Sequence, residues 1–506
     1  MKNKIFSLNN LSKILLQDRN RKKIVLCHGV FDLVHIGHVE HFRKAKSLGD
    51  ILVVTITADE FVNKGPGRPY FDTNLRQKFL SSLEMIDYVS VVNSLSAVEA
   101  IRSIRPNFYC KGRDYKDNSK DITNKIKKEI YELKKVNGKI IYTEEVTFSS
   151  SKLINSEKIG LKDNQFKILN SIKARYSYQK IESIFLDLSK TKVLVIGEAI
   201  IDKYNFCDPL GKSGKDPIMM FKNIRSESYA GGSAAISNHL GSFTNAIKLI
   251  STCGFNKDKI FFFKKNFKNR IKSVFISKKN SPTIVKEKYI DDISKTKLIG
   301  FYNFNDSSLS PSEEKKLKKE ILNNIKKHNF VIVADYGHGM ISNKMSNLLS
   351  KKVGFLSVNA QINAANYGHH TLKKYSRSKI IFINESELRH ELRERELSTE
   401  ELMKIFSGNI KVSYVIVTRG SEGAILYDKI NNKFIYSPSF ADKVLDKIGA
   451  GDAMFAIFSI FLYKTKDLEF SLFISSLAAA QSVQNMGNSK SVDKNIILKT
   501  IRHLIS

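Results

Sequence analysis

The stretch KIVLCHGVFDLVHIGHVEHF, residues 23–42, shows how the first part of the chain is built. An apolar run at residues 24–27 predicts a strand, and the pattern after residue 35 predicts a helix. Four of the chain's eleven histidines lie between residues 28 and 42. In an open parallel sheet, ligands bind at the carboxyl ends of strands, against helix N-termini. The histidines therefore lie where a phosphate or a metal would bind.

Phosphate is the better candidate for this position. A helix that begins near His38 offers unpaired N–H groups and a positive dipole end, and Gly37 lets the backbone approach a triphosphate closely. Zinc is the alternative, but the pair His35 and His38 supplies only two ligands, and no nearby cysteine pair completes a tetrahedron. We expect His28 and His41, which flank the pair, to be structural.

Working outward, apolar runs alternate with helical patterns from residue 23 to residue 146. This alternation predicts parallel strands in a doubly wound sheet. A polar helical stretch follows, and the pattern restarts at KVLVIGEAIID (192–202), with later runs FVIVADYG, KIIFIN and SYVIVTRG. We expect an α/β protein of two different doubly wound domains, residues 1–155 and 189–506, joined by a helical connector at 156–188.

Composition agrees with a multidomain globular protein. The chain has 506 residues, of which 42% are hydrophobic and 10% aromatic, enough for two or three cores. It has no apolar run of about 18 residues, and its first residues lack the apolar segment of a signal peptide. The four cysteines lie far apart, without a C-x-x-C pair. We therefore expect a cytoplasmic protein with no membrane partner.

The formal net charge of +33 has two explanations. A basic chain can bind nucleic acid or anionic membrane. A lysine-rich composition combined with phosphate-bearing substrates gives the same charge. Because the lysines are scattered over predicted helix faces, as in KIKKEIYELKK (125–135), and no aromatics interleave them as in nucleic-acid-binding motifs, we expect no nucleic-acid partner.

Residues 22–155 resemble the cytidylyltransferase-like nucleotidyltransferases, a Rossmann-like family. The likeness starts at HIGH (35–38), continues through AKSLGDILVVTITADEF (45–61) and RPNFYCKGRDY (105–115), and ends at TFSSSKLI (147–154). It is greatest to the adenylyltransferases of ADP-heptose synthesis. The resemblance implies that a sugar phosphate attacks the α-phosphorus of ATP, CTP or GTP and that pyrophosphate leaves.

The same resemblance implies which residues act in this domain. His35 and His38 would stabilise the transferring charge, and Lys46 would be the nearby cation. Asp32 could instead fix the loop, and a serine run is more often a helix cap. The implied nucleotide- or phosphate-binding residues are Gly29, Phe31, Gly37, Lys46, Lys111, Arg113, Ser149, Ser150 and Ser151.

A second phosphate motif is DKIGAGDAMFA, residues 446–456. Gly449, Ala450 and Gly451 would present backbone N–H groups at a helix start, an anion hole for a transferring phosphoryl group. Asp452 follows, placed to accept the proton of an attacking hydroxyl. Residues 190–506 as a whole resemble the ribokinase-like sugar kinases, with AGGSAAISNHLGSF (230–243) as their glycine-glycine motif.

This resemblance implies an ATP- and Mg²⁺-dependent kinase. The implied residues that contact the sugar are Asp202, Gly231, Gly232, Asn238 and Asp335. The loop beside the nucleotide would contain Thr418, Gly420 and Gly423, and the N-x-x-E motif of Asn384 and Glu387 would place magnesium indirectly.

Three departures bear on function. Lys447–Ile448 stands where the family usually has threonine, residues 358–375 differ from the heptose kinases, and the kinase follows the transferase instead of preceding it. We expect a bifunctional enzyme that phosphorylates a sugar or sugar phosphate and then activates it with a nucleotide. The alternative is a nucleotidyltransferase with a non-catalytic kinase-like regulatory module. A homodimer through the lid strands, here PTIVKEKYID (282–291), is also expected.

Overall fold

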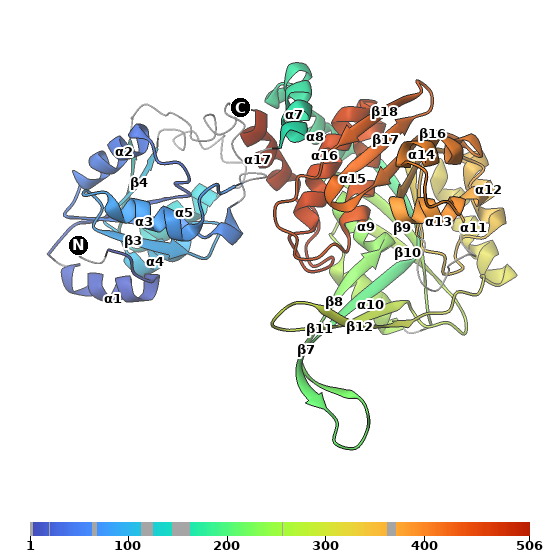
Figure 1. Ribbon diagram of the computed structural model, residues 1–506, viewed down its shortest axis with the longest axis horizontal. Helices are drawn as coiled ribbons and strands as arrows, with labels where there is room; N and C mark the ends of the chain where they lie inside the picture. The colour runs from blue at the N-terminus through green and yellow to red at the C-terminus, as the bar shows by residue number, and fades with distance from the viewer. Residues whose placement is uncertain are drawn as a thin grey trace. The chain divides into compact units, whose positions relative to one another are not determined.

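The computed structural model describes residues 4–19, 21–62, 68–112, 125–143, 162–255, 257–361 and 371–505. The chain forms two compact units, residues 1–170 with 495–506 and residues 171–494. These bounds differ from the predicted domain limits at both ends of the connector. Each unit is described below by itself (Figure 1).

The first unit is built on five parallel strands in the order β3-β2-β1-β4-β5. The strands are β1 (Ile24–Gly29), β2 (Ile51–Thr57), β3 (Tyr88–Val92), β4 (Phe108–Gly112) and β5 (Lys139–Thr143). The helices are α1 (Leu8–Asp18), α2 (Ile36–Lys46), α3 (Thr73–Ser82), α4 (Val98–Ile104) and α5 (Lys125–Lys135). The order reverses between β1 and β4, and in open α/β sheets ligands bind at the carboxyl ends of strands at such a reversal.

Side-chain alternation along β1 divides the core of this unit into two layers. Ile24 and Leu26 pack with residues of α1, α4 and α5. Val25 and Cys27 face the other way and pack with Phe42 of α2 and residues of α3. Both faces of the parallel sheet are therefore covered, as the predicted doubly wound fold requires. Helix α1, which we did not predict, closes the first face.

The second unit contains a nine-stranded sheet in the order β10-β9-β6-β13-β14-β15-β16-β17-β18. It is parallel from β10 to β16 and antiparallel at β17 and β18. The strands are β6 (Lys192–Gly197), β9 (Ala246–Cys253), β10 (Ile271–Ser277), β13 (Phe330–Asp335), β14 (Leu356–Ala360), β15 (Arg377–Asn384), β16 (Lys411–Thr418), β17 (Ala424–Asp428) and β18 (Lys433–Ser437).

A separate sheet of four strands, called the small sheet below, has the order β12-β11-β7-β8. It consists of β7 (Ala199–Lys212), β8 (Met219–Gly232), β11 (Val285–Asp291) and β12 (Lys297–Asn303), and the β7–β8 hairpin projects well beyond the rest of the sheet (Figure 1). The predicted single strand 192–202 thus splits between two sheets. Gly197 permits the break, because a Cβ there would lie 2.0 Å from the carbonyl oxygen of Ala334.

Helices cover both faces of the large sheet. They are α8 (Tyr178–Asp187), α9 (Ser233–Leu240), α10 (Lys257–Asn266), α11 (Pro311–Ile325), α12 (Asn343–Lys352), α13 (Glu385–Leu392), α14 (Thr399–Gly408), α15 (Ala450–Thr465) and α16 (Leu468–Ser482). Helices α7 (Asp163–Arg175) and α17 (Lys494–Ile505) lie at the unit limits. Residues Ala453–Leu462 of α15 are all buried, so α15 is an internal helix.

The described part of the predicted connector contains α7 and α8, and α8 belongs to the core of the second unit. Phe185 of α8 is 1% exposed. Its ring contacts Phe243 and Phe461, with ring centroids 5.7 and 4.9 Å away. Residues 178–187 are therefore part of the second unit and not a free linker.

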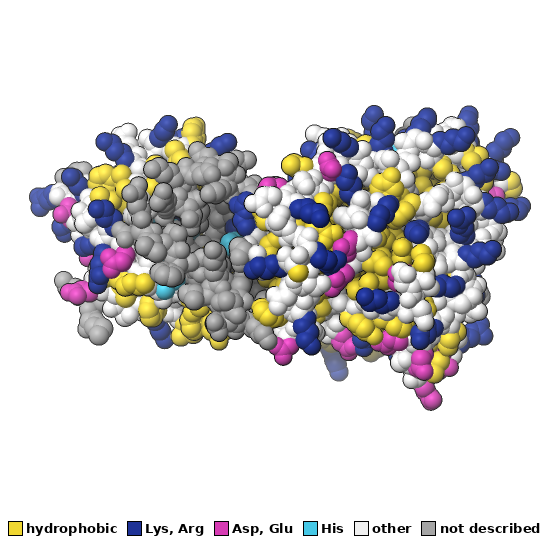
Figure 2. Space-filling view, turned by 90° about the horizontal axis from the view of Figure 1, so that it is seen from above, with side chains coloured by type: hydrophobic (Ala, Val, Ile, Leu, Met, Phe, Trp, Pro, Cys, Tyr) yellow, Lys and Arg dark blue, Asp and Glu magenta, His cyan; other side chains and the backbone are white. Residues whose placement is uncertain are grey.

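Surface composition fits the scattered lysines of the sequence. Lysine and arginine side chains are spread over the visible face without a continuous patch (Figure 2). In the part of the chain that the structure describes, no helix has the length and apolar character needed to cross a membrane. All four cysteines are free and buried.

Replacing Phe185 with alanine tests the assignment of α8. We expect the variant to destabilise the second unit by about 3–5 kcal/mol, because a buried aromatic leaves a cavity. Leu186→Ala is the matched control, since Leu186 is 64% exposed. Differential scanning calorimetry of the full chain measures the unfolding temperature of each variant. An unfolding temperature of Phe185→Ala equal to that of the wild type would contradict the assignment.

Candidate active sites

The first site is the start of α2, where His35 and His38 lie together. His35 is the N-cap residue. Its Nδ1 accepts a hydrogen bond from the Gly37 N–H at 3.2 Å, and the Nδ1 of His38 accepts one from the His35 N–H at 3.3 Å. The two ring centroids are 4.0 Å apart. The structure thus places both predicted histidines at the helix N-terminus, where the dipole favours anions.

These cap bonds fix the tautomer of both rings. Since each Nδ1 of His35 and His38 accepts from a backbone N–H, a neutral ring carries its proton on Nε2. Each Nε2–H is then a donor, the group needed to stabilise charge on a transferring phosphate.

The loop before α2 is shaped by an aromatic contact. Phe31 adopts a positive φ of 47°, and its ring meets His38 edge-on with centroids 5.6 Å apart. Gly29 lies under this ring, because a Cβ there would come 2.9 Å from Phe31 Cζ. These two predicted residues therefore position His38; direct contact with a nucleotide stays a prediction.

Lys111 lies at the strand-order reversal. It is the second-last residue of β4, and its Nζ donates to the carbonyl oxygen of His28 at 3.4 Å. Glu129 partly balances its charge, with Nζ and Oε2 3.7 Å apart. This buried cation therefore lies at the carboxyl ends of β1 and β4, where the fold expects a ligand.

Three neighbouring residues have structural partners. His28 Nδ1 lies 3.0 Å from Thr55 Oγ1, and His41 Nδ1 lies 2.8 Å from Thr143 Oγ1. Burial, reinforced by the Lys111 charge, lowers the pKa of His41 to about 4. Asp32 accepts hydrogen bonds from the backbone N–H groups of residues 70 and 71, both at 2.9 Å, and therefore fixes the loop.

The sequence analysis did not identify Arg76, a buried residue whose hydrogen bonds hold the loop before α2. Arg76 of α3 is 2% exposed. Its guanidinium donates to the carbonyl oxygens of Val30 and Thr57 at 2.7 and 3.0 Å and pairs with Asp59 at 2.6 Å. The only sequence signal is an arginine on the inner face of a predicted helix.

The prediction for Lys46 is wrong. Lys46 is the last residue of α2, and its Nζ pairs with Asp87 at 2.5 Å. Because a helix rises about 1.5 Å per residue, this ammonium is at the opposite end of α2 from the histidines. Arg113, Ser149, Ser150 and Ser151 lie outside the described residues.

The second site is the start of α15. Gly449 is its N-cap residue with φ of +83°, and no side chain caps the first turn. The N–H groups of Ala450, Gly451 and Asp452 have no partner within the helix. The structure therefore places these N–H groups at an uncapped helix start, and their binding of a phosphoryl group stays a prediction.

Asp452 occupies the first turn of α15 and is half-buried. Its Oδ1 accepts a hydrogen bond from the Tyr336 hydroxyl at 2.8 Å. Burial raises the pKa of Asp452 to about 7, and the nearby Asp202 contributes to the rise. The Tyr336 hydrogen bond and the Lys286 charge act in the opposite direction. A carboxyl with this pKa can accept a proton near neutral pH.

Asp202 faces this site from the small sheet. A Cβ at Gly231 would lie 2.2 Å from Asp202 Oδ2, so glycine is required for the carboxylate to lie against the backbone. Gly232 has φ of +58° and begins α9. The structure thus brings together three of the five residues predicted to contact the sugar: Asp202, Gly231 and Gly232.

Two lysines of β11, missed from sequence, share this region. Lys288 Nζ is 3.4 Å from Asp202 Oδ1. Lys286 lies opposite Asp202 in the strand register. Burial lowers the pKa of Lys286, whereas Asp202 and Asp452 oppose the fall. The two acids are therefore electrostatically balanced by two lysines.

Asp335, a predicted sugar contact, has buried structural partners, and its contact with a sugar stays a prediction. Its Oδ2 pairs with Lys374 at 2.5 Å and accepts from the Tyr375 hydroxyl at 2.6 Å. The neighbouring Glu198, also missed, accepts from the Tyr336 N–H at 3.0 Å. Burial and the adjacent Asp335 raise the pKa of Glu198 to about 7. These acids hold the loop after β13, and their oxygens are already engaged.

The predicted nucleotide side lies at the ends of β15 and β16, where Asn384 and Thr418 are register partners. Gly420 and Gly423 take positive φ values of 57° and 94°. Asn384 and Glu387 form a reciprocal capping box for α13, which is itself a sufficient reason for the N-x-x-E pattern.

Magnesium fits this chain mainly through substrate phosphates. Among the described residues, no cluster of three or more histidines, cysteines or acids could hold a metal ion. Mg²⁺ commonly keeps several waters and binds one or two carboxylates plus phosphates. A magnesium role for Asn384 and Glu387 stays a prediction.

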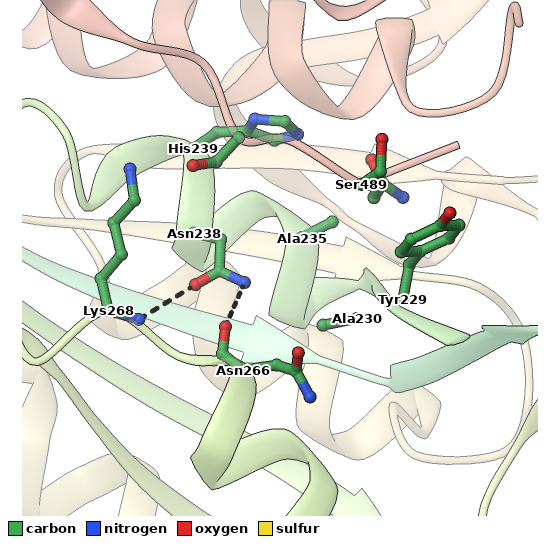
Figure 3. A pocket seen from close by; sticks show the side chains of 10 residues that line it. Tyr229, Ala230, Ala235, Asn238, His239, Asn266, Lys268 and Ser489 are labelled. Carbon is green, nitrogen blue, oxygen red and sulfur yellow. Dashed lines mark hydrogen bonds between the residues drawn. The ribbon is translucent and has the colours of Figure 1, made fainter. Parts of the chain in front are cut away.

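A pocket of about 130 Å³ lies beside the glycine pair (Figure 3). Its lining residues are Tyr229, Ala230, Ala235, Asn238, His239, Asn266, Lys268, Asn488, Ser489 and Ser491. The Asn238 side chain bonds the Asn266 carbonyl at 3.1 Å and the Lys268 N–H at 3.3 Å. Asn238 therefore has structural partners at the pocket wall, and its contact with a sugar stays a prediction.

Two helix starts, each at the carboxyl edge of a largely parallel sheet, form the arrangement found in α/β enzymes that bind phosphate groups. Residues 190–495 match the model of the pfkB family of carbohydrate kinases, and the chain belongs to this family. Residues 26–156 match the cytidylyltransferase-like family. The transferase-like region thus precedes the kinase region, as expected from the sequence.

The curated relatives match only a short part of the chain. The bifunctional protein HldE of Geobacter metallireducens is 40% identical over 115 residues, 22% of this chain and 24% of the relative. HldE of Wolinella succinogenes is 42% identical over 115 residues, with the same coverage. The chain therefore spans about a quarter of the length of these relatives.

A likeness to solved structures concerns the fold alone. Phosphofructokinase-2 of Escherichia coli, in complex with potassium, aligns with a TM-score of 0.50 at 14% identity; the alignment covers 62% of this chain and 99% of that chain.

Phosphoryl transfer should require ionised Asp452. We expect kcat/KM to rise with pH and to level off above about 7, because protonated Asp452 cannot accept a proton. Tyr336→Phe should move this rise to higher pH, since the lost hydrogen bond stabilised the carboxylate. Tyr427→Phe is the control, because its hydroxyl bonds Asn432 elsewhere. A pH–rate profile of Tyr336→Phe that matches wild type would contradict this role.

Proposed function

We propose that the chain is a bifunctional enzyme that makes a nucleotide-activated sugar. The second unit phosphorylates a sugar or sugar phosphate with Mg-ATP, at the anomeric oxygen. The first unit joins the resulting sugar 1-phosphate to a nucleotide and releases pyrophosphate. The proposal is carried by one observation: the chain has two separate helix starts, at His35 and at Gly449, each built to receive phosphate.

A heptose 7-phosphate is the acceptor that the relatives favour. HldE matches the chain at 40% identity, although over only 24% of its own length. With this acceptor, a phosphatase must remove the 7-phosphate between the two steps. The product would then be an ADP-heptose-like donor.

The nucleotidyl transfer needs no protein nucleophile. The attacking sugar phosphate is already anionic, so the protein has to stabilise the charge that develops on the α-phosphate and on pyrophosphate. The Nε2–H groups of His35 and His38 and the first N–H groups of α2 are suitable donors. Lys111 adds a cation at the same edge.

The phosphorylation needs a base, because a sugar hydroxyl must lose its proton. Asp452 accepts that proton, while the N–H groups at the start of α15 receive the phosphoryl oxygens. Asp202, held against Gly231, bonds acceptor hydroxyls. Mg²⁺ would bind the nucleotide phosphates and offset their charge.

One feature favours a non-catalytic kinase-like module. Ile448 replaces a hydroxyl residue before the glycine turn. However, the Ile448 N–H donates to Asp446 at 3.2 Å, so the turn is held without that hydroxyl. The retained geometry of Asp452 supports catalysis.

Two variants separate the activities. Asp452→Asn should abolish ADP release with a panel of sugars and sugar phosphates but leave pyrophosphate release from sugar 1-phosphate and triphosphate intact. His38→Ala should do the converse, with about a hundredfold or greater loss of nucleotidyl transfer. Loss of both activities in either variant would contradict two independent sites. Absence of phosphorylation by the wild type across the panel would favour the regulatory module.

We also propose a homodimer formed through the small sheet. The predicted strand β11 is internal, between β12 and β7, so it cannot pair at an edge. The hairpin and β12 instead expose apolar side chains, including Phe221 at 38% and Phe301 at 56% exposure. Exposed patches of this kind mark interfaces.

Phe221→Asp combined with Phe301→Asp should convert the dimer to monomer, because each aspartate would bury an unpaired charge in the interface. Ile430→Asp is the control, since Ile430 is 63% exposed in the turn between β17 and β18. Light scattering after gel filtration measures the mass of each variant. A wild-type monomer at tens of micromolar protein would refute the proposal.

A further inference from the structure

Asp446, at the start of the DKIGAGD motif, is a buried acid with partners on several elements. Its Oδ1 pairs with Lys297 Nζ at 2.5 Å and accepts from the Ile448 N–H at 3.2 Å. Its Oδ2 accepts from the Tyr204 hydroxyl at 3.1 Å and from the Gly487 N–H at 2.9 Å. The side chain is 1% exposed. Asp446 therefore joins segments that are far apart in sequence.

Two of these partners belong to the small sheet. Tyr204 lies on β7, two residues after Asp202, which faces the acceptor. Lys297 is the first residue of β12. The strand that presents Asp202 and the edge strand of the same sheet are thus both tied to one carboxylate.

The other two partners are backbone N–H groups, one in the turn before α15 and one beside a residue that contacts that turn. Ile448 immediately precedes Gly449, the N-cap of α15. Gly487 precedes Asn488, whose amide lies against Gly449: a Cβ on that glycine would be 2.2 Å from Asn488 Oδ1. Asp446 is therefore connected to the turn at Gly449 in two ways: through its bond to Ile448, and through Gly487 and the neighbouring Asn488.

An ion pair that is partly exposed at one end holds the small sheet to Asp446. Burial disfavours the charge of Asp446, but Lys297 and the two N–H groups outweigh it and hold the pKa below its usual value. The carboxylate is therefore ionised. The Lys297 side chain is 39% exposed, so water can reach its end of the pair. Movement of the small sheet would leave a buried, unpaired charge, which is unfavourable.

We propose that Asp446 is a positioning residue that couples the small sheet to the anion hole, so that acceptor binding at Asp202 and phosphate binding at Gly449–Gly451 favour each other. The inference rests on the proposed kinase function. When the turn before α15 is ordered, Asp446 is held where it can bond Tyr204 and Lys297. When these two residues of the small sheet bond Asp446, they in turn stabilise that turn. Such coupling is reciprocal by thermodynamic necessity.

Hydrogen–deuterium exchange of the full chain tests the coupling, with magnesium AMP-PNP as the probe. At saturation, we expect the nucleotide to slow amide exchange in β7 and β12 of the wild type by about fivefold or more, although it binds on the other side of the site. Lys297→Met should lose this protection while AMP-PNP still binds. Asp446→Asn, which keeps the shape of the side chain, should behave in the same way.

Lys203→Met is the matched control. Lys203 also lies on β7 and pairs with a carboxylate of the same sheet, Glu287, at 3.3 Å. This variant should keep the protection. Unchanged protection in Lys297→Met, or its absence in the wild type with bound nucleotide, would overturn the coupling. Failure of the wild type to bind AMP-PNP in calorimetry would instead refute the kinase function.

Discussion

Backbone N–H groups at the starts of α2 and α15 are the feature from which both sites follow. The first N–H groups of a helix have no partner within it. At α2, His35 caps the Gly37 N–H, and the remaining groups and the two imidazoles face the same place. At α15, Gly449 has no side chain with which to cap, so the turn stays available to a ligand. Sheet topology then brings acids and bases to each helix start.

The second site depends equally on how charge is balanced in a buried region. Asp202 raises the pKa of Asp452 and Lys286 opposes that rise, while Lys288 of β11 pairs with Asp202. Glu198 and Asp335 form another acidic pair, which Lys374 offsets. Because these lysines come from different elements than the acids, the charges stabilise both the site and the packing of the small sheet against the large one.

The sequence predicted those features that depend on local patterns. The apolar runs of β1, β6, β13 and β16 identify the strands, and the positions of His35, His38 and Asp452 follow from motifs at helix starts. The role of Lys46 came from the family resemblance, whereas its place at the last residue of α2, away from the histidines, follows from the length of the helix. The structural partners of Asp335 and Asn238 could not be seen in the sequence either. Their polar atoms are engaged by Tyr375, Lys374 and backbone groups that lie far away in sequence or across a loop.

Buried residues that support the sites gave the weakest signals. Arg76 and Glu198 each bond several backbone groups of a functional loop, but a lone arginine in a helix or a glutamate after a strand is common in exposed positions. Only tertiary contacts distinguish them. The same holds for Asp446, whose place in DKIGAGD is visible in sequence but whose partners Tyr204 and Lys297 come from the small sheet.

The two acceptors of the proposed function account for two unlike sets of side chains at the two sites. A sugar phosphate that attacks a nucleotide is already ionised, so donors suffice, and imidazoles at a helix start provide them without carrying a full charge. A sugar hydroxyl must lose a proton as it attacks, so an acid with a raised pKa is needed beside the anion hole, as Asp452 provides. Exchanging the two sets would fail in both units: Asp452 would repel an anionic acceptor, and the histidine pair, with both Nδ1 atoms occupied as acceptors, would present N–H groups to a hydroxyl that needs a base.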